Sequence, residues 1–90
     1  MEQWRELIES CRNGEKRGWS QLFETYAEPV FNSLLSFGAD RDLAGDILGD
    51  SFIHLMEKNA YRLREATFQS ESQFQWWLII IARNLLRSRQ

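Results

Sequence analysis

The feature that most constrains the fold is the segment 72–87, which is predicted to form the last helix of the chain. Its apolar residues recur three and four positions apart, as they do along one face of an amphipathic α-helix. Ser72 and Gln75 stand where a capping box would begin this helix, because a hydroxyl and an amide three residues apart can each accept a hydrogen bond from the other's backbone N–H. The predicted core face consists of Phe74, Trp77, Leu78, Ile81, Ala82, Leu85 and Leu86.

A second stripe of the same segment has less usual chemistry. Trp76, Ile80, Arg83 and Arg87 stand at positions i, i+4, i+7 and i+11, so they share one side of the helix. An aromatic ring followed by two guanidinium groups is not typical of a purely solvated surface. A small domain also exposes some apolar side chains without functional consequence, and that explanation suffices for Ile80 taken alone. The whole stripe is therefore a candidate binding surface.

Three further helices are predicted upstream. The first covers about 2–13 and stops at Gly14, the second covers about 18–37 and stops at Gly38, and the third covers about 41–58 with Asp40 as its N-cap. Cys11 lies on the apolar side of the first helix and is interpreted as a core residue. The inward faces of the second and third helices comprise Trp19, Leu22, Phe23, Tyr26, Ala27, Val30, Phe31, Leu34 and Leu35, then Leu43, Ala44, Ile47, Leu48, Phe52, Leu55 and Met56.

The segment 60–71 has weak periodicity and is predicted to be an irregular loop that follows Asn59 and contains at most one helical turn. Phe68 in this loop is either an anchor in the core or a surface aromatic, and the pattern leaves both open. The fold class is all-α: a small helical bundle of three long helices plus a short N-terminal helix. Residues 1–90 form one domain, and the final helix lacks a stop signal, which indicates a fragment of a longer chain.

Composition excludes several classes of function. One Cys rules out an internal disulfide and a cysteine-based zinc site, and one His argues against a histidine metal site or a catalytic triad. No apolar run reaches membrane-spanning length and no signal peptide precedes the first helix, so a cytoplasmic location without membrane contact is expected. Asp46 and Asp50 have no His or Lys beside them in the pattern, and no phosphate-binding glycine loop is present. We predict a binding protein without cofactor or metal, not an enzyme.

The polar side of the third helix carries one more candidate surface. Asp46, Gly49, Asp50, Ile53 and Glu57 recur at helical spacing. Gly49 would let another surface approach closely, although it costs the helix about 1 kcal/mol relative to Ala. An ordinary solvated acidic face explains the pattern slightly better when the pattern is considered alone.

Three ordered segments resemble region 2 of bacterial RNA polymerase sigma factors, most closely the extracytoplasmic-function group. The resemblance extends from Trp19 to Arg87. It rests on LFETYAEPVF at 22–31, on AGDILGDSF at 44–52, and on SQF, WL and IARNL at 72–74, 77–78 and 81–85. Each segment alone is a weak signal, whereas three in the family's order and spacing are fairly specific.

The resemblance implies a transcription initiation factor domain that binds the RNA polymerase core and recognises and melts the −10 promoter element. The third helix would dock on the clamp helices of the largest subunit through Asp46, Gly49, Asp50, Ile53 and Glu57. The loop before the last helix would capture an unstacked base of the non-template strand, and the last helix would hold the melted DNA open. The implied DNA-binding residues are Phe68, Ser70, Ser72, Gln73, Trp76, Ile80, Arg83, Asn84 and Arg87.

The chain departs from the family at a few positions. Gly49 stands where Gln is usual, and Ile79 and Ile80 stand where aromatic or basic residues are common. No second domain for upstream promoter recognition is present in these 90 residues. The alternative function is a sigma-like mimic or interaction module that binds a regulatory anti-sigma protein instead of DNA, which would not need Arg83, Asn84 and Arg87. A coincidental similarity would leave the order of the motifs unexplained.

Overall fold

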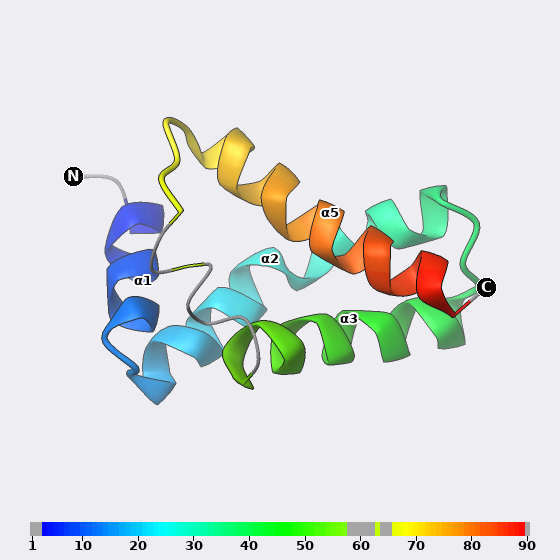
Figure 1. Cartoon of the computed structure of the whole chain (residues 1–90), viewed down its shortest axis with the longest axis horizontal. Coiled ribbons are helices and arrows are strands. Elements are labelled where there is room, and N and C mark those ends of the chain that lie inside the picture. Colours follow the sequence, from blue (N-terminus) through cyan, green and yellow to red (C-terminus); the bar gives the residue numbers. More distant parts are fainter. Residues whose placement is uncertain (1–2, 58–62, 64–65, 90) are drawn as a thin grey trace.

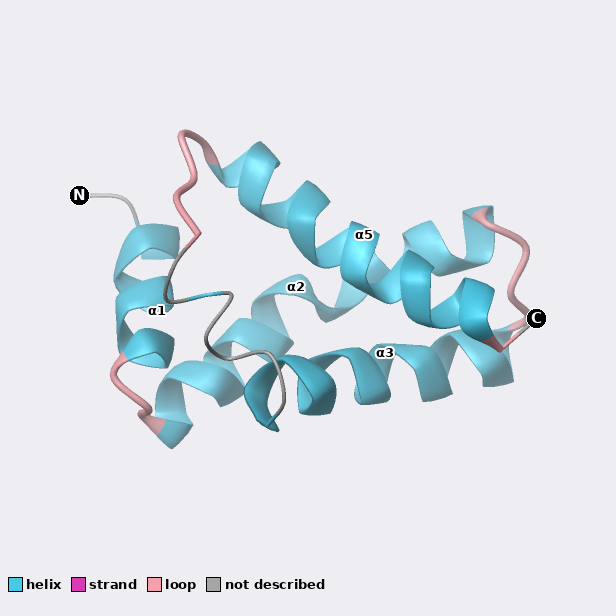
Figure 2. Ribbon diagram, viewed as in Figure 1, coloured by secondary structure: helices cyan, strands magenta, loops and turns pink. Residues whose placement is uncertain are grey.

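The computed structural model describes residues 3–57, 63 and 66–89. This part of the chain contains helices α1 (Gln3–Arg12), α2 (Lys16–Ser36), α3 (Arg41–Glu57) and α5 (Glu71–Ser88), and it contains no strand (Figures 1 and 2). α2 contacts all three other helices, and α3 also packs against α5. Figure 1 shows α3 and α5 running in opposite directions in front of α2, with α1 standing across one end. The prediction of an all-α chain is confirmed.

The glycine stops that end the first two helices are confirmed. Gly14 and Gly38 have φ angles of 78° and 103°, which glycine adopts without steric cost. In each case the next residue donates its backbone N–H to the carbonyl five positions earlier. Glu15 does so to Ser10 at 3.1 Å, and the equivalent bond after Gly38 is also 3.1 Å. These are the bonds of the Schellman motif, which satisfies carbonyls that the ending helix leaves free.

Asp40 caps α3 as predicted, because its carboxylate accepts a hydrogen bond from the backbone N–H of Leu43 at 2.8 Å. The described part of α3 ends at Glu57. The predicted end of this helix at Lys58 and Asn59, and most of the predicted loop that follows, lie outside the described residues.

The predicted cap of α5 is wrong by two residues. The N-cap is Ser70, not Ser72, and its hydroxyl accepts from the N–H of Gln73 at 3.1 Å. The Gln73 amide oxygen in turn accepts from the N–H of Gln69 at 2.7 Å. The sequence offers two overlapping Ser-x-x-Gln motifs, and the fold uses the earlier one.

A tertiary contact accounts for the choice of cap. Starting the helix after Ser70 places Glu71 in the first turn, where the helix dipole favours a carboxylate. The same placement lets the buried Tyr26 hydroxyl donate to Glu71 at 2.8 Å. Burial and this hydrogen bond both raise the pKa of Tyr26 above its ordinary value. The cap is therefore fixed partly by α2, which lies far away in the sequence.

The core is centred on Phe74, which is fully buried. Its ring meets four other aromatic rings, with centroid separations of 6.3 Å to Trp4, 5.2 Å to Tyr26, 5.0 Å to Phe68 and 6.2 Å to Trp77. These contacts join α1, α2 and α5 with the segment that precedes α5. Among the residues that the structure describes, the other buried apolar side chains are Ile8, Cys11, Leu22, Val30, Leu34, Ala39, Ala44, Ile47, Phe52, Leu55, Leu63, Leu78, Ile79, Ala82 and Leu86.

Several positions differ from the predicted core. Ile79 is buried, because α5 packs against both α2 and α3 and its covered arc is wider than one helix face. Phe23 and Met56 were expected to face inward but are 37% and 42% exposed. Both line a groove formed by residues of α2 and α3. None of the described helices is long and apolar enough to cross a membrane.

Gly18 is a contact residue, not the start of a helix. α2 begins two residues earlier, at Lys16, and Gly18 is buried in its first turn. A Cβ atom on Gly18 would lie 2.4 Å from Ser10 Oγ, 2.8 Å from Ser10 Cβ and 3.0 Å from the Cys11 backbone nitrogen. The absent side chain therefore lets α1 approach α2. Cys11 is buried as predicted, and burial, with a smaller effect of Glu15, raises the pKa of its thiol to about 12.

Gly18→Ala is expected to lower the free energy of unfolding by roughly 1–3 kcal/mol, because the new methyl group overpacks the contact between α1 and α2. Gly45→Ala is the matched control. Gly45 is also helical, but nothing lies within 4 Å of a Cβ atom there. That variant should gain up to about 1 kcal/mol from helix propensity. Urea unfolding of both variants measures the difference, and equal stabilisation by both would contradict the close approach.

Candidate functional site

The predicted polar face of α3 exists as one surface. Asp46, Ile53 and Glu57 are exposed, and Gly49 and Asp50 are half-buried. Ile53 is 51% exposed and adds apolar area beside the carboxylates. The surface therefore combines carboxylates with exposed apolar area.

An apolar groove lies along the α2 edge of this face. It has a volume of about 450 Å³. The rings of Phe23 and Phe52 meet edge to face in it, with centroids 5.0 Å apart. Sequence reasoning missed the groove because it assigned Phe23 and Met56 to the core. The second helix carries more apolar residues than its neighbours cover, since Phe23 remains 37% exposed. The lining residues are Trp19, Ser20, Phe23, Glu24, Gly49, Phe52, Ile53 and Met56.

A small hollow of about 250 Å³ lies on the other edge of the face, between α3 and the end of α5. Asp50 forms an ion pair with Arg89 here, 39 positions away in the sequence. Asp46 forms no ion pair within the described residues. The hollow is lined by Asp50, Ile53, His54, Glu57, Leu85 and Arg89.

The two neighbouring tryptophans of α5 face different environments, as predicted. Trp76 is 54% exposed. Trp77 is half-buried and packs against Phe68 and Phe74, with centroids 5.3 Å and 6.2 Å apart. Further along the stripe, Ile80 is half-buried, whereas Asn84 and Arg87 are exposed. Trp76 is thus the most accessible aromatic ring on α5.

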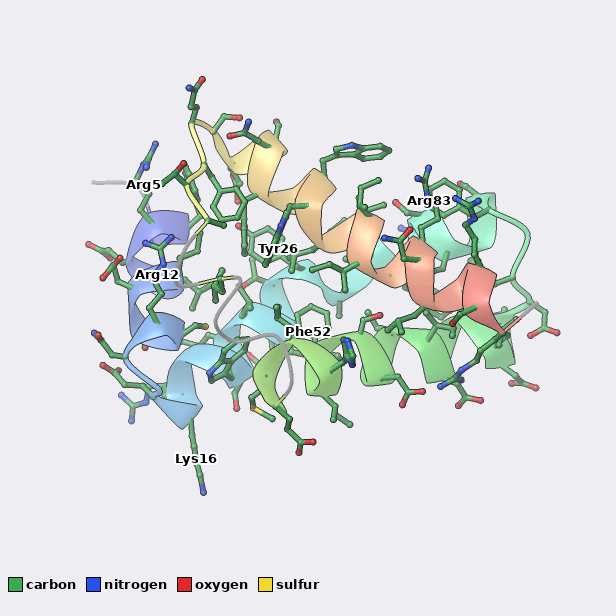
Figure 3. All side chains as sticks on the ribbon, in the orientation of Figure 1. Arg5, Arg12, Lys16, Tyr26, Phe52 and Arg83 are labelled. Atoms are coloured by element: carbon green, nitrogen blue, oxygen red, sulfur yellow. The ribbon has the colours of Figure 1, made fainter. Side chains whose placement is uncertain are left out.

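Arg83 is less free than the sequence indicates. It is half-buried, and its guanidinium carbon lies 5.9 Å from the centre of the Phe37 ring. Figure 3 shows Arg83 projecting from α5 towards the end of α2. Its Nε is buried and has no hydrogen-bond partner among the described residues. Phe37 was missed as a site residue because it reads as the end of a helix. Its position beside a glycine stop gives no sign of a cation–π contact.

α1 holds the segment that leads into α5. Arg12 donates from Nε to the carbonyl of Leu63 at 3.0 Å and from a terminal nitrogen to the carbonyl of Ala66. Arg5 donates to the carbonyl of Gln69 at 3.3 Å. Figure 3 shows both arginines on α1, beside this segment. Sequence reasoning overlooked them, although their spacing of seven places them on one side of the first helix.

The predicted loop contacts therefore divide into different structural roles. Phe68 is buried, so the possibility of a core anchor is confirmed and it offers no ring to a ligand in this conformation. Ser70 and Gln73 are exposed but already close the cap of α5. Ser72 is exposed and lies in the first turn. Within the described residues, no cluster of His, Cys, Asp and Glu could hold a metal ion.

Comparisons with known proteins give one relative of interest. The chain matches no protein-family model and no solved structure. It is 30% identical over 87 residues to the RNA polymerase sigma-H factor of Pseudomonas aeruginosa, a match that covers 97% of this chain. The sequence is sigma-factor-like. The chain spans 42% of the length of that relative, so the activities of the whole relative are not carried by the similarity alone.

Proposed function

We propose that this sigma-factor-like chain is a transcription initiation factor domain that docks on the polymerase core through α3 and acts on promoter DNA through α5. The observation that carries the proposal is the similarity to the sigma-H factor along nearly the whole chain. That similarity points to a non-enzymatic transcription factor. The extracytoplasmic-function group and the melting of the −10 element are the finer parts of the proposal.

The chemistry of the α3 face suits the clamp helices as a partner. Asp46, Asp50 and Glu57 would attract a basic helical surface and set its orientation, since charge complementarity contributes mainly to association rate and specificity. The groove beside them offers exposed Phe23 and Met56. Covering apolar area contributes about 25 cal/mol for each Å² removed from water. The combination supports a partner that presents basic and apolar side chains together.

The stripe on α5 suits single-stranded DNA. A base that leaves the duplex loses stacking at a cost of a few kcal/mol, and the exposed ring of Trp76 can replace it. Stacking on an aromatic side chain contributes roughly 1–3 kcal/mol per base. Arg87 would contact phosphate, and Asn84 lies beside it on the exposed side. Ile80 and Arg83 complete the proposed surface, with Arg83 held against Phe37.

The loop residues have a more limited place in this proposal. Ser72 remains available to the non-template strand at the start of α5, whereas Phe68 would act only by supporting Phe74 from behind. Ser70 and Gln73 could reach a base only at the expense of their cap hydrogen bonds. The main contribution to DNA binding is therefore assigned to Trp76 and Arg87.

The test is binding of a fluorescent forked −10 promoter fragment to polymerase core mixed with this protein. Trp76→Ala is expected to weaken binding at least fivefold, from the loss of one stacking contact. Arg87→Ala should weaken binding and reduce its salt dependence, because one phosphate contact is lost. Arg17→Ala is the matched control, since Arg17 is an exposed arginine of α2 outside both proposed surfaces. Arg17→Ala should change neither the affinity for the promoter fragment nor its salt dependence.

A different result would favour the alternative function. If wild-type protein and core together show no affinity for the fork beyond that of core alone, the DNA-binding part of the proposal is wrong. The interaction-module function, with an anti-sigma protein as partner, would then fit better. All measurements use one fixed salt concentration, except those that determine the salt slope.

A further inference from the structure

Asp46 and Asp50 lie one turn apart on the same side of α3, yet their surroundings differ. Asp46 is exposed and forms no ion pair within the described residues. Asp50 is paired with Arg89, which follows the last residue of α5. The two side chains of this pair are 45% and 43% exposed, so water and a partner protein can both reach them.

Arg89 pairs with one oxygen of the Asp50 carboxylate, so a cation of a docking partner would have to share that carboxylate and would meet the like charge of Arg89. The pair spans the hollow between α3 and α5, which is lined by Ile53, His54 and Leu85 among others. Because Arg89 is exposed and does not belong to the buried core, it can swing away without uncovering that core. The exchange of one exposed ion pair for another costs little in water, since such pairs are weak and screened.

We propose that Arg89 is an internal competitor for the docking face: it offsets the charge of Asp50 in the free protein and moves aside when a basic partner pairs with that carboxylate. The proposal rests on the proposed docking of the polymerase clamp on α3. According to this proposal, Asp46 and Asp50 contribute differently to docking. Asp46 offers its full charge to the first encounter, whereas Asp50 offers its full charge only after Arg89 has moved.

The experiment measures the affinity of this protein for a fragment containing the clamp helices of the largest polymerase subunit, by titration calorimetry at low salt. Arg89→Ala is expected to bind about 1.5- to 5-fold more tightly than wild type, which is the range for removing one exposed ion pair. Arg17→Ala controls for the change in net charge and should not reproduce the gain. Asp46→Asn should weaken binding more than Asp50→Asn.

A double-mutant cycle isolates the competition. In the Asp50→Asn background, Arg89→Ala should have no effect, because the carboxylate that Arg89 masks is already absent. The gain from Arg89→Ala should also disappear near 0.5 M salt, where the screening length is only a few Å. Urea unfolding of each variant verifies that the changes in affinity do not reflect loss of fold.

The outcomes separate the two levels of the proposal. If wild type binds the fragment and Arg89→Ala binds no more tightly than Arg17→Ala, the competition is wrong and the docking stands. If Arg89→Ala strengthens binding equally with and without Asp50, Arg89 acts through its charge alone and the competition is also wrong. If wild type does not bind the fragment at all, both the docking and the competition fail.

Discussion

Phe74→Ala is expected to lower the free energy of unfolding by roughly 3–5 kcal/mol, which is most of the stability of a domain this small. Phe74 is fully buried and touches the rings of Trp4, Tyr26, Phe68 and Trp77. Alanine would leave a cavity at the point where these rings meet. The rings pack closely against one another, so the surrounding side chains cannot easily move to fill the cavity. Thermal and urea unfolding, followed by far-UV circular dichroism, measure the loss.

Trp76→Ala and Trp77→Ala provide matched controls on the same helix. Trp76 is mostly exposed, so its truncation should change stability by less than about 1 kcal/mol. Trp77 is half-buried against Phe68 and Phe74. The loss of stability in Trp77→Ala should therefore lie between the losses in Phe74→Ala and Trp76→Ala. The expected order of destabilisation is Phe74, then Trp77, then Trp76. A Trp76 variant that unfolds while the Trp77 variant stays folded would show that the register of α5 is wrong.

The double replacement Asp46→Lys and Asp50→Lys is expected to abolish docking on the clamp-helix fragment. Two carboxylates facing a basic surface would become two cations, and like charges at such an interface cost several kcal/mol. The affinity should fall about a hundredfold or more. Neither side chain belongs to the buried core, so the fold should survive. Pull-down and calorimetry with the fragment measure the effect.

A charge-matched variant shows whether the effect is local. Glu6→Lys with Glu28→Lys changes the net charge by the same amount, at exposed positions on α1 and α2. It should reduce the affinity only slightly, through the long-range field. Undiminished binding by the Asp46 and Asp50 double variant would refute the assignment of α3 as the docking helix.

Local signals in the sequence predicted the ends of α1 and α2 and the start of α3. Gly14 and Gly38 could be recognised because only glycine readily adopts the left-handed φ that a Schellman motif requires. Asp40 could be recognised because its short carboxylate caps the next turn. Each of these signals acts within five residues. The order of helices and the all-α class follow directly from them.

Features that depend on contacts between distant segments could not be predicted from local sequence patterns. The use of Ser70 instead of Ser72 occurs together with the hydrogen bond from Tyr26 to Glu71, which no local pattern contains. Gly18 looked like a boundary, but its role is the close approach of α1. Periodicity also identifies the side of a helix that is buried, but not the width of the covered arc.

The candidate surfaces show the same division. The stripe on α5 and the acidic face of α3 were predicted from spacing, and the structure places their residues as the spacing requires. The Arg89–Asp50 pair and the contact of Arg83 with Phe37 join segments that are far apart in the sequence. Neither leaves a local pattern. For the same reason, the hydrogen bonds from Arg5 and Arg12 to the segment before α5 were not predicted.

The four tryptophans occupy four different settings, and this distribution gives the protein its own optical probes. Trp4 is buried beside Phe74, Trp77 lies at the edge of the same aromatic cluster, Trp19 lines the groove next to α3, and Trp76 faces solvent on α5. Indole emission depends on exposure to water, so each ring would respond to a different event. A protein that retains only Trp19 would change its emission when a partner covers the groove, and one that retains only Trp76 would be quenched by a stacked base. Docking and DNA capture could then be timed separately by stopped-flow fluorescence, without an attached dye.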